Sequence, residues 1–312
     1  MKNRAVANTG DFLKEMLSSF WHYLKKLYDK FDKDQIWILS SGVSFSIILV
    51  IIPLVLILFT VLGIYLDKTD AVLKINEYIN QLFPLNISYK EKFLANIMEK
   101  VDEISKHTFL TGALGIAGVL WTMSSLFSYM RDAMNRIYNV DQSLNFFKGK
   151  LRDFMLLIII VVLFIASTLV TSFYHFSVAY LKDLPDIFNN IVLITYILPI
   201  SLSLVITFGL FYFLYALVPH YRIPQKALLL STLIASVLFE IMKFLFSYYV
   251  LNISNYKYIY GAYAAVVITL LWIYVISLIF CIGAAIGQIY VEKNKLKIIL
   301  NNDKNNGTEK TV

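Results

Sequence analysis

The sequence predicts an all-α, polytopic membrane protein with six transmembrane helices, and three observations carry this prediction. Of the 312 residues, 58% are hydrophobic and only 16% are charged, and the mean hydropathy is +0.67. Soluble domains average about 45–50% apolar and about 25% charged residues, so both fractions depart from that class. Finally, six stretches approach or exceed the roughly 20 mostly apolar residues that cross a bilayer as a helix.

These six stretches set the expected domain organisation. They cover residues 36–66, 109–130, 154–180, 191–218, 227–251 and 259–290. Together they form a membrane domain over residues 36–291, with one long outer loop at residues 67–108 whose amphipathic patterns predict short helices. Residues 1–35 form a cytoplasmic N-terminal segment. Residues 292–312 form a polar cytoplasmic tail that we expect to be disordered.

The distribution of basic residues predicts that both termini face the cytoplasm. Segments on the same side as the termini hold 19 Lys and Arg residues, and segments on the opposite side hold 8. Lys and Arg accumulate in cytoplasmic loops, so this asymmetry gives an N-in, C-in topology. The first 35 residues are too polar for the core of a cleavable signal peptide, so the first span is expected to act as an uncleaved signal.

The composition also narrows the expected partners and cofactors. Basic cytoplasmic flanks facing anionic lipid account for the net charge of +7, so no nucleic-acid partner is expected. Cys281 is the single cysteine, which leaves no disulfide and no cysteine-rich metal site. We expect no cofactor and no metal. Membrane lipids are the expected partners, and a homo-oligomer or an envelope-protein partner stays open.

Residues 11–31 have the pattern of an amphipathic helix. Its apolar face consists of Phe12, Leu13, Met16, Leu17, Phe20, Leu24, Leu27, Tyr28 and Phe31. Its polar face carries four lysines, Lys14, Lys25, Lys26 and Lys30. Such a helix either lies on the cytoplasmic membrane surface or packs beneath the helix bundle, and the pattern fits both.

The fifth span carries two charged residues near its middle, Glu240 and Lys243, within the stretch LFEIMKFLF. A charge at the bilayer centre costs about 2.5–3.5 kcal/mol on insertion scales. Their spacing of three residues puts both on one helix face, where they can pair, and we expect that face to point into the bundle. The pair fixes helix packing or marks a polar point on a substrate or ion path, or else Lys243 snorkels toward the membrane interface.

A second polar group lies at the inner end of the second span, in SYMRDAMNRIYNV. It comprises Arg131, Asp132, Asn135 and Arg136. Asp132 precedes Arg136 by four residues, the favourable order for an ion pair on a helix. The group is either a solvated helix end with positive-inside charges or a cytoplasmic gate that meets a phosphate headgroup or an anionic substrate.

Glycines and prolines within the spans are expected to set helix packing or kinks. These residues are Pro53, Gly112, Gly115, Gly118, Pro199, Gly261, Gly283 and Gly287. Small residues at spacings of three or four let helices approach closely in lipid. Proline inside a span frees a carbonyl that neighbours or water must satisfy, so we expect kinks or local opening at both prolines.

Four segments together carry a family resemblance: SSGVSFSIILVIIPLVLILFTVLG, LTGALGIAGVLWTMSSLFSYMRDAMNRIYNV, LFEIMKFLFSYYV and YIYGAYAAVVITLLWIYVISLIFCIGA. In this order they resemble the YihY/BrkB family of bacterial inner-membrane proteins, also called BrkB-type virulence factors, over roughly residues 12–291. Two positions depart from the family: Ala285 stands where an acid is frequent, and Ser46 where tyrosine is usual. The resemblance implies a polytopic helix bundle in the bacterial cytoplasmic membrane.

Older records attach a ribonuclease name to this family. The histidines of this chain show whether a nuclease site of that kind could form. A metal-dependent nuclease of the metallo-β-lactamase type needs clustered His and Asp ligands around zinc. The four histidines, His22, His107, His175 and His220, include no His-x-His pair, and the predicted topology places two on each side of the membrane. We therefore expect no enzymatic activity.

Three functional hypotheses follow from the polar residues. The first is a transporter or exporter, with a lipid or another amphiphile as cargo and with spans two, five and six lining the path. The second is a non-transporting scaffold for envelope integrity or assembly. The third is ion or proton exchange at Glu240, which is weaker because Lys243 should hold the acid ionised.

Overall fold

The computed structural model describes residues 25–65, 108–140, 149–159, 162, 198–252, 257–300 and 310–311. The chain divides into two compact units. The first unit comprises Met1–Ser44 and Phe127–Val312, and the second comprises Phe45–Leu126. Each unit is held together mainly by contacts among its own residues.

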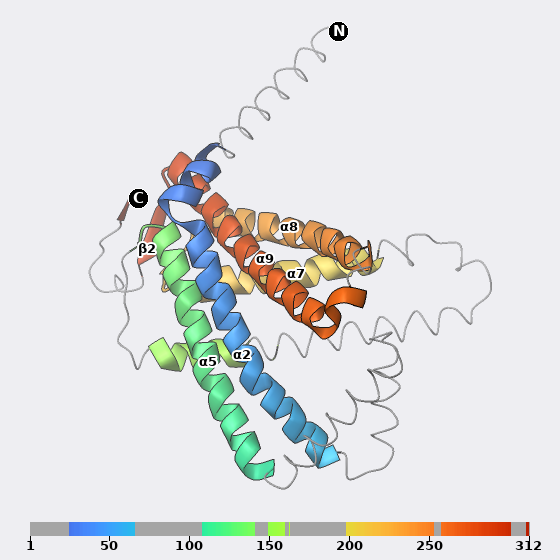
Figure 1. The fold of residues 1–312 in the computed structure, drawn as a ribbon. Helices are drawn as coiled ribbons and strands as arrows, with labels where there is room; N and C mark the ends of the chain where they lie inside the picture. The colour runs from blue at the N-terminus through green and yellow to red at the C-terminus, as the bar shows by residue number, and fades with distance from the viewer. Residues whose placement is uncertain are drawn as a thin grey trace, which may run out of the picture. The chain divides into compact units, whose positions relative to one another are not determined.

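Five long helices dominate the described part of the chain (Figure 1). They are α2 (Ile36–Tyr65), α5 (Thr108–Ile137), α7 (Leu198–Leu217), α8 (Gln225–Asn252) and α9 (Lys257–Lys293). Residues 25–33 and 149–159 are also helical. Within α2 the helix runs unbroken past Pro53.

Four segments of these helices are long and apolar enough to cross a membrane: Ile36–Val61, Phe109–Ile137, Gln225–Tyr249 and Val266–Lys293. They correspond to the first, second, fifth and sixth predicted spans. The shorter apolar helix Ser201–Leu217 coincides with the inner part of the predicted fourth span. The protein is thus a helical membrane protein. Most of the third span, and all but Thr108 of the outer loop, lie outside the described residues.

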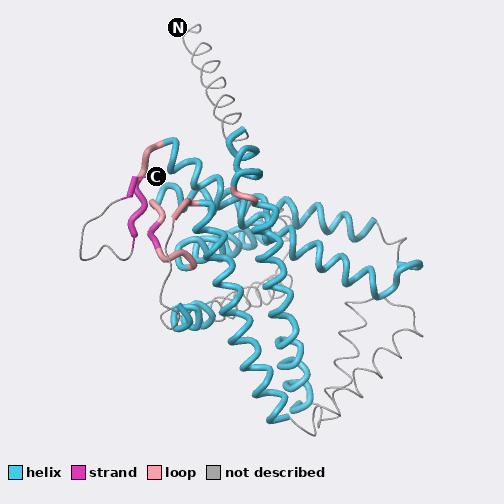
Figure 2. The backbone as a smooth tube through the Cα atoms, turned by 60° about the vertical axis from the view of Figure 1, so that its left-hand side comes forward, coloured by secondary structure: helices cyan, strands magenta, loops and turns pink. Residues whose placement is uncertain are grey.

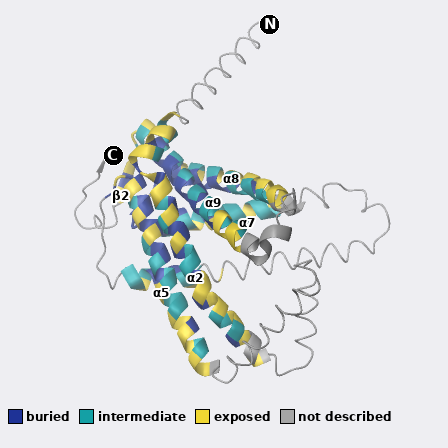
Figure 3. Cartoon of the chain, viewed as in Figure 1, coloured by how far each residue is buried: buried dark blue, intermediate teal, exposed yellow. Residues whose placement is uncertain are grey.

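Large apolar side chains cover the outer faces of the helices. Trp37, Ile52, Leu114, Phe244 and Val267 are all exposed, and Figure 3 shows exposed residues along every long helix. Such surfaces are costly in water but favourable against lipid chains. Buried residues of the first unit instead concentrate toward one end, where α9 and α5 terminate and α8 begins.

In the second unit, the glycines of α5 face α2 at close range. A methyl group at Gly115 would lie 2.8 Å from Cγ1 of Ile57, and one at Gly118 would lie 2.8 Å from Cβ of Pro53. A methyl group at Gly112 would lie 3.1 Å from the Thr60 methyl. The glycine spacing therefore lets the two helices approach more closely than alanine would allow.

In the first unit, the two glycines of α9 face hydroxyl groups. A methyl group at Gly287 would overlap Oγ of Ser231 and lie 2.6 Å from the Tyr138 hydroxyl. At Gly283 it would overlap the hydroxyl of Tyr215, which donates a 2.8 Å hydrogen bond to the carbonyl of Phe280. These glycines make room for polar side chains, a role that small-residue spacing alone does not predict.

The C-terminal ends of α5 and α9 are closed by the same backbone motif. After α5, Asn139 N–H bonds to Arg136 O and Val140 N–H bonds to Asn135 O, with Asn139 at φ 52°. After α9, Lys295 N–H bonds to Glu292 O and Leu296 N–H bonds to Val291 O, with Lys295 at φ 49°. Both patterns are Schellman caps, which satisfy helix carbonyls through a left-handed residue.

Three short strands complete the first unit and lie together at one side of it (Figure 2). β1 (Tyr221–Arg222) pairs antiparallel with β2 (Lys297–Leu300), which pairs with β3 (Lys310–Thr311). The tail from residue 292 was expected to be disordered, and the structure differs there because α9 continues to Lys293 and β2 follows. The pairing with β1 supplies backbone partners that the tail sequence alone does not reveal.

The helical residues 25–33 reverse part of the predicted amphipathic pattern. Lys30, assigned to the polar face, is only 7% exposed, whereas Tyr28, assigned to the apolar face, is 78% exposed. The Lys30 ammonium donates to Asp34 at 2.7 Å and to the carbonyl of Ile137 at 3.0 Å. A cation at the C-terminal end of α5 complements its free carbonyls. Residues 25–33 thus contact the C-terminal ends of α5 and α9, while residues 1–24 lie outside the described part.

Candidate functional site

The predicted pair in the fifth span joins two helices. Glu240 Oε2 lies 2.5 Å from Nζ of Lys243, and Glu240 Oε1 accepts hydrogen bonds from Ser203 at 2.9 Å and from Thr207 at 3.1 Å. Lys243 also donates to Oγ of Ser203 at 2.7 Å. Since Ser203 and Thr207 belong to α7, the pair faces the neighbouring helix. We call these four residues the mid-span network.

The two charged members of the mid-span network differ in exposure. The Glu240 side chain is 10% exposed and the Lys243 side chain is 40% exposed. Aromatic rings lie along the same helix, with Trp272 of α9 between Phe239 and Phe246 at centroid distances of 5.7 Å and 4.5 Å. The carboxylate of Glu240 is therefore anchored inside the bundle, while the Lys243 side chain is partly exposed at the bundle surface.

The structure separates the four residues of the predicted gate. Both Asp132 and Arg136 are described, yet they form no ion pair, because the Arg136 guanidinium donates to Oε1 of Gln35 at 2.7 Å. The expected pairing between these two residues is therefore wrong. Asn135 contributes its carbonyl to the Schellman cap of α5. Arg131 alone points into a buried cluster.

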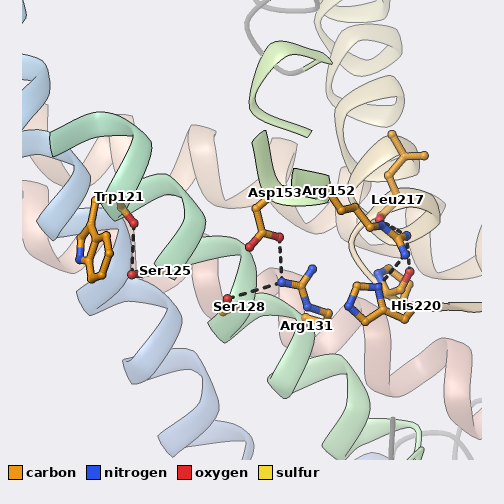
Figure 4. Close-up of polar contacts among 9 residues, drawn as sticks. Trp121, Ser125, Ser128, Arg131, Arg152, Asp153, Leu217 and His220 are labelled. Carbon is orange, nitrogen blue, oxygen red and sulfur yellow. Dashed lines mark hydrogen bonds and ion pairs between the residues drawn. The ribbon is translucent and has the colours of Figure 1, made fainter. Parts of the chain in front are cut away.

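That cluster joins three elements of the first unit: α5, the helical residues 149–159 and the segment that follows α7 (Figure 4). Nη2 of Arg131 lies 2.8 Å from Oδ1 of Asp153, a buried carboxylate in helical residues 149–159. The neighbouring Arg152 donates from Nη1 to Nδ1 of His220 at 2.6 Å and from Nη2 to two backbone carbonyls. We call Arg131, Arg152, Asp153 and His220 the helix-end network.

Within the helix-end network, Arg152 caps the C-terminal end of α7. Its Nη2 donates to the carbonyls of Leu217 and Pro219, each at 2.7 Å. Leu217 is the last residue of α7, so the guanidinium caps carbonyls that have no partner within the helix. A positive charge at a helix C-terminus is also favoured by the helix dipole.

The contact with Arg152 fixes the protonation state of His220. A guanidinium can only donate, so Nδ1 of His220 must accept, and the ring is then neutral with its proton on Nε2. Burial, together with the Arg131 and Arg152 guanidiniums, lowers the pKa of His220 from its usual 6.5 to about 4. Burial and the charge of Arg131 also lower the pKa of Arg152.

The family model described as "Virulence factor BrkB" matches residues 27–306. The match spans nearly the whole chain and includes both networks. The chain belongs to the virulence factor BrkB family. The resemblance of the four quoted segments to the YihY/BrkB family is therefore confirmed.

Similar BrkB-family relatives are bacterial proteins named "UPF0761 membrane protein". The relative from Cronobacter sakazakii is 25% identical over 88% of this chain and 90% of its own length. Those from Prosthecochloris aestuarii and Legionella pneumophila are each 25% identical, over 89% and 91% of this chain. The match spans 64% and 65% of those two relatives, somewhat under two thirds of their length. No solved structure matches the chain.

The remaining predicted positions of this BrkB-family chain are only partly described. Pro199 and Gly261 lie within α7 and α9, and their side-chain surroundings fall outside the described part. Of the four histidines only His220 is described. Among the described residues, no group of three or more His, Cys, Asp or Glu side chains could hold a metal ion.

Sequence reasoning missed Arg152, Asp153, His220, Ser203 and Thr207 as members of the two networks. Arg152 and Asp153 occur in an ordinary basic loop pattern before the predicted third span. Ser203 and Thr207 do carry a signal, because they are four residues apart on an otherwise apolar helix. Such spacing puts both hydroxyls on one face, where a buried charge on a neighbouring helix can use them.

Proposed function

We propose that the protein is a six-span transporter of the bacterial cytoplasmic membrane, with both termini inside, that moves a lipid or another amphiphile. The observation that carries this proposal is the 40% exposed side chain of Lys243 beside the buried Glu240, in the middle of an apolar helix. A charge placed there is costly, and intramembrane charges in transporters mark substrate or ion paths. The basic inner flanks support the orientation.

The mid-span network suits a transient polar contact. Ser203 and Thr207 hold the carboxylate of Glu240, so the anchor does not depend on the position of Lys243. The flexible lysine stem can then exchange its contact with Glu240 for one with a polar headgroup. Inside the membrane the dielectric constant is low, so the Lys243 ammonium interacts strongly both with Glu240 and with a charged headgroup.

The test is reconstitution of the full chain into liposomes that contain fluorescent lipids and ion-sensitive dyes. We expect lipid movement above that of empty liposomes, with at least about a tenfold loss in Lys243→Met, equivalent to about 1.4 kcal/mol of barrier. Lys226→Met is the matched control, because Lys226 is an exposed lysine at the start of the same helix. Absence of both lipid and ion movement, together with wild-type behaviour of Glu240→Gln in cells, contradicts transport.

A non-transporting scaffold is the second candidate, and one observation favours it. Glu240 is linked by hydrogen bonds to α7 and by an ion pair within α8, so the network ties two helices together. The double variant Glu240→Gln/Lys243→Gln separates the two functions. If the protein is a scaffold, the variant should lose its function in cells only to the extent that it loses thermal stability. If the protein is a transporter, the variant should lose lipid movement even where the fold is retained.

A further inference from the structure

The Arg131 guanidinium is buried and only partly satisfied. It is 7% exposed, and its Nη2 contacts Asp153 at 2.8 Å and Ser128 at 3.5 Å. Its Nη1 is buried and has no hydrogen-bond partner among the residues that the structure describes. A buried donor without a partner is costly, and more so on a charged group, so a partner from outside the chain would be stabilising.

Among the residues that the structure describes, the charges of the helix-end network do not balance. Arg131 and Arg152 contribute two positive charges, and Asp153 contributes one negative charge. The acceptors around Arg152 are neutral, namely two carbonyls and the His220 ring. Asp132, the residue after Arg131, is exposed. Within the described part of the chain, the cluster therefore keeps an excess positive charge around the buried Arg131, where the attraction for an anion is strong.

The His220 ring is buried in the same cluster as Arg131 and adds a donor (Figure 4). With Nδ1 accepting from Arg152, the neutral ring carries its hydrogen on Nε2. A neutral donor next to a guanidinium can share an anion without adding charge repulsion.

We propose that the helix-end network binds a phosphate group, with Arg131 Nη1 as its principal ligand and Arg152 and His220 as supporting groups. Phosphate fits because it has several acceptor oxygens and up to two negative charges, and guanidinium groups match its geometry. A lipid headgroup and free phosphate share this chemistry. The site is independent of the proposed transport, since it lies at the helix ends and a scaffold could hold it equally well.

The test uses the purified full chain in a neutral detergent. Replacing potassium chloride by potassium phosphate at constant ionic strength should raise the unfolding midpoint of the wild type by about 2–4 °C, as expected for a ligand that binds the folded state. The double variant Arg131→Gln/Asp153→Asn removes the Nη1 donor without stranding a charge, and should lose this shift. Arg222→Gln, an exposed arginine of β1, is the matched control and should retain it.

Two further arms identify the source of the phosphate group. Equilibrium dialysis with radiolabelled inorganic phosphate should give about one bound phosphate per wild-type chain if free phosphate is the ligand, and none for the double variant. In nanodiscs, a rise in midpoint with phosphatidylglycerol over phosphatidylcholine that is seen only in the wild type identifies a lipid headgroup. Equal shifts in the wild type and the double variant, or no shift in any arm, overturn the proposal. Neither result depends on whether liposome transport is observed.

Discussion

The mid-span network and the helix-end network are both polar clusters in an apolar protein, but they are satisfied in different ways. Glu240 and Lys243 lie in the middle of α8, and hydroxyl side chains of α7 supply their remaining contacts. Arg131 lies in the last two turns of α5 and Arg152 contacts the end of α7, and a carboxylate, a histidine and backbone carbonyls supply their contacts. The first network is close to neutral, whereas the second carries excess positive charge.

This difference follows from where backbone acceptors are available. Within a helix every carbonyl bonds to the N–H four residues later, so a mid-span charge must find side-chain partners. The last four carbonyls of a helix have no such partner, and cations can use them. Arg152 does so at the end of α7 and Lys30 at the end of α5. The helix ends can thus hold more positive charge than the mid-span can.

The largest contrast is expected from neutralising one acid in each network. Asp153→Asn strands the buried guanidinium of Arg131 and should lower the free energy of unfolding by about 3–5 kcal/mol. Glu240→Gln should lower it by only about 1–2 kcal/mol, because the amide oxygen still accepts from Ser203 and Thr207 and Lys243 is partly exposed. Unfolding of both variants in one detergent checks this, and equal losses would show that the two sites do not differ.

A second contrast concerns packing at the helix-end side. Gly287→Ala forces a methyl group into the hydroxyls of Ser231 and Tyr138 and should cost about 1–3 kcal/mol. Gly209→Ala on α7 is the control, since no atom lies within 4 Å of the added methyl, and it should be neutral or stabilising by about 0.5–1 kcal/mol. Thermal unfolding of the two variants measures the difference. A Gly287→Ala protein as stable as Gly209→Ala would mean that the hydroxyls move aside freely.

The same glycines show how far the sequence predicts the structure. The apolar runs and the glycine spacing on α5 and α9 predict helices that pack closely in a membrane. Both patterns can be recognised within a single stretch of sequence. The partners of those glycines are not local: Ser231 and Tyr138 come from different elements, and nothing in their own neighbourhoods selects them. Likewise Glu240 and Lys243 were found by spacing, whereas the contacts of Arg131 with Asp153 and of Lys30 with Ile137 required the folded chain.

The third prediction is a pH dependence of the free energy of unfolding that His220 produces. Because the pKa of His220 is about 4 in the folded state and near 6.5 when unfolded, the unfolded chain binds its proton first as the pH falls. The stability attributable to neutral His220 is therefore complete above about pH 6.5 and is lost as the pH falls from there through about 4.

Comparison with His220→Gln isolates this contribution, since glutamine can accept from Arg152 but does not titrate. The difference in unfolding midpoint between wild type and variant should change across pH 4–6.5, and the wild type should lose more stability on acidification. Glu240→Gln provides the mid-span comparison and should retain the His220-dependent loss of stability across this window. A difference between wild type and His220→Gln that is independent of pH would contradict a neutral, buried histidine.

The smallest expected effect tests how much of the helix-end stability comes from the backbone and not from basic side chains. Lys295 closes α9 at φ 49°, a conformation that costs a residue with a Cβ about 1–2 kcal/mol. Lys295→Gly removes this strain but gains unfolded-state entropy, so a net stabilisation of about 0.5 kcal/mol is expected. Lys293→Gly, at the last residue of α9 where the backbone is still helical, should destabilise by about 0.5–1 kcal/mol. If Lys295→Gly destabilises instead, the lysine side chain contributes to the helix end as Lys30 and Arg152 do, and the excess positive charge there extends to α9.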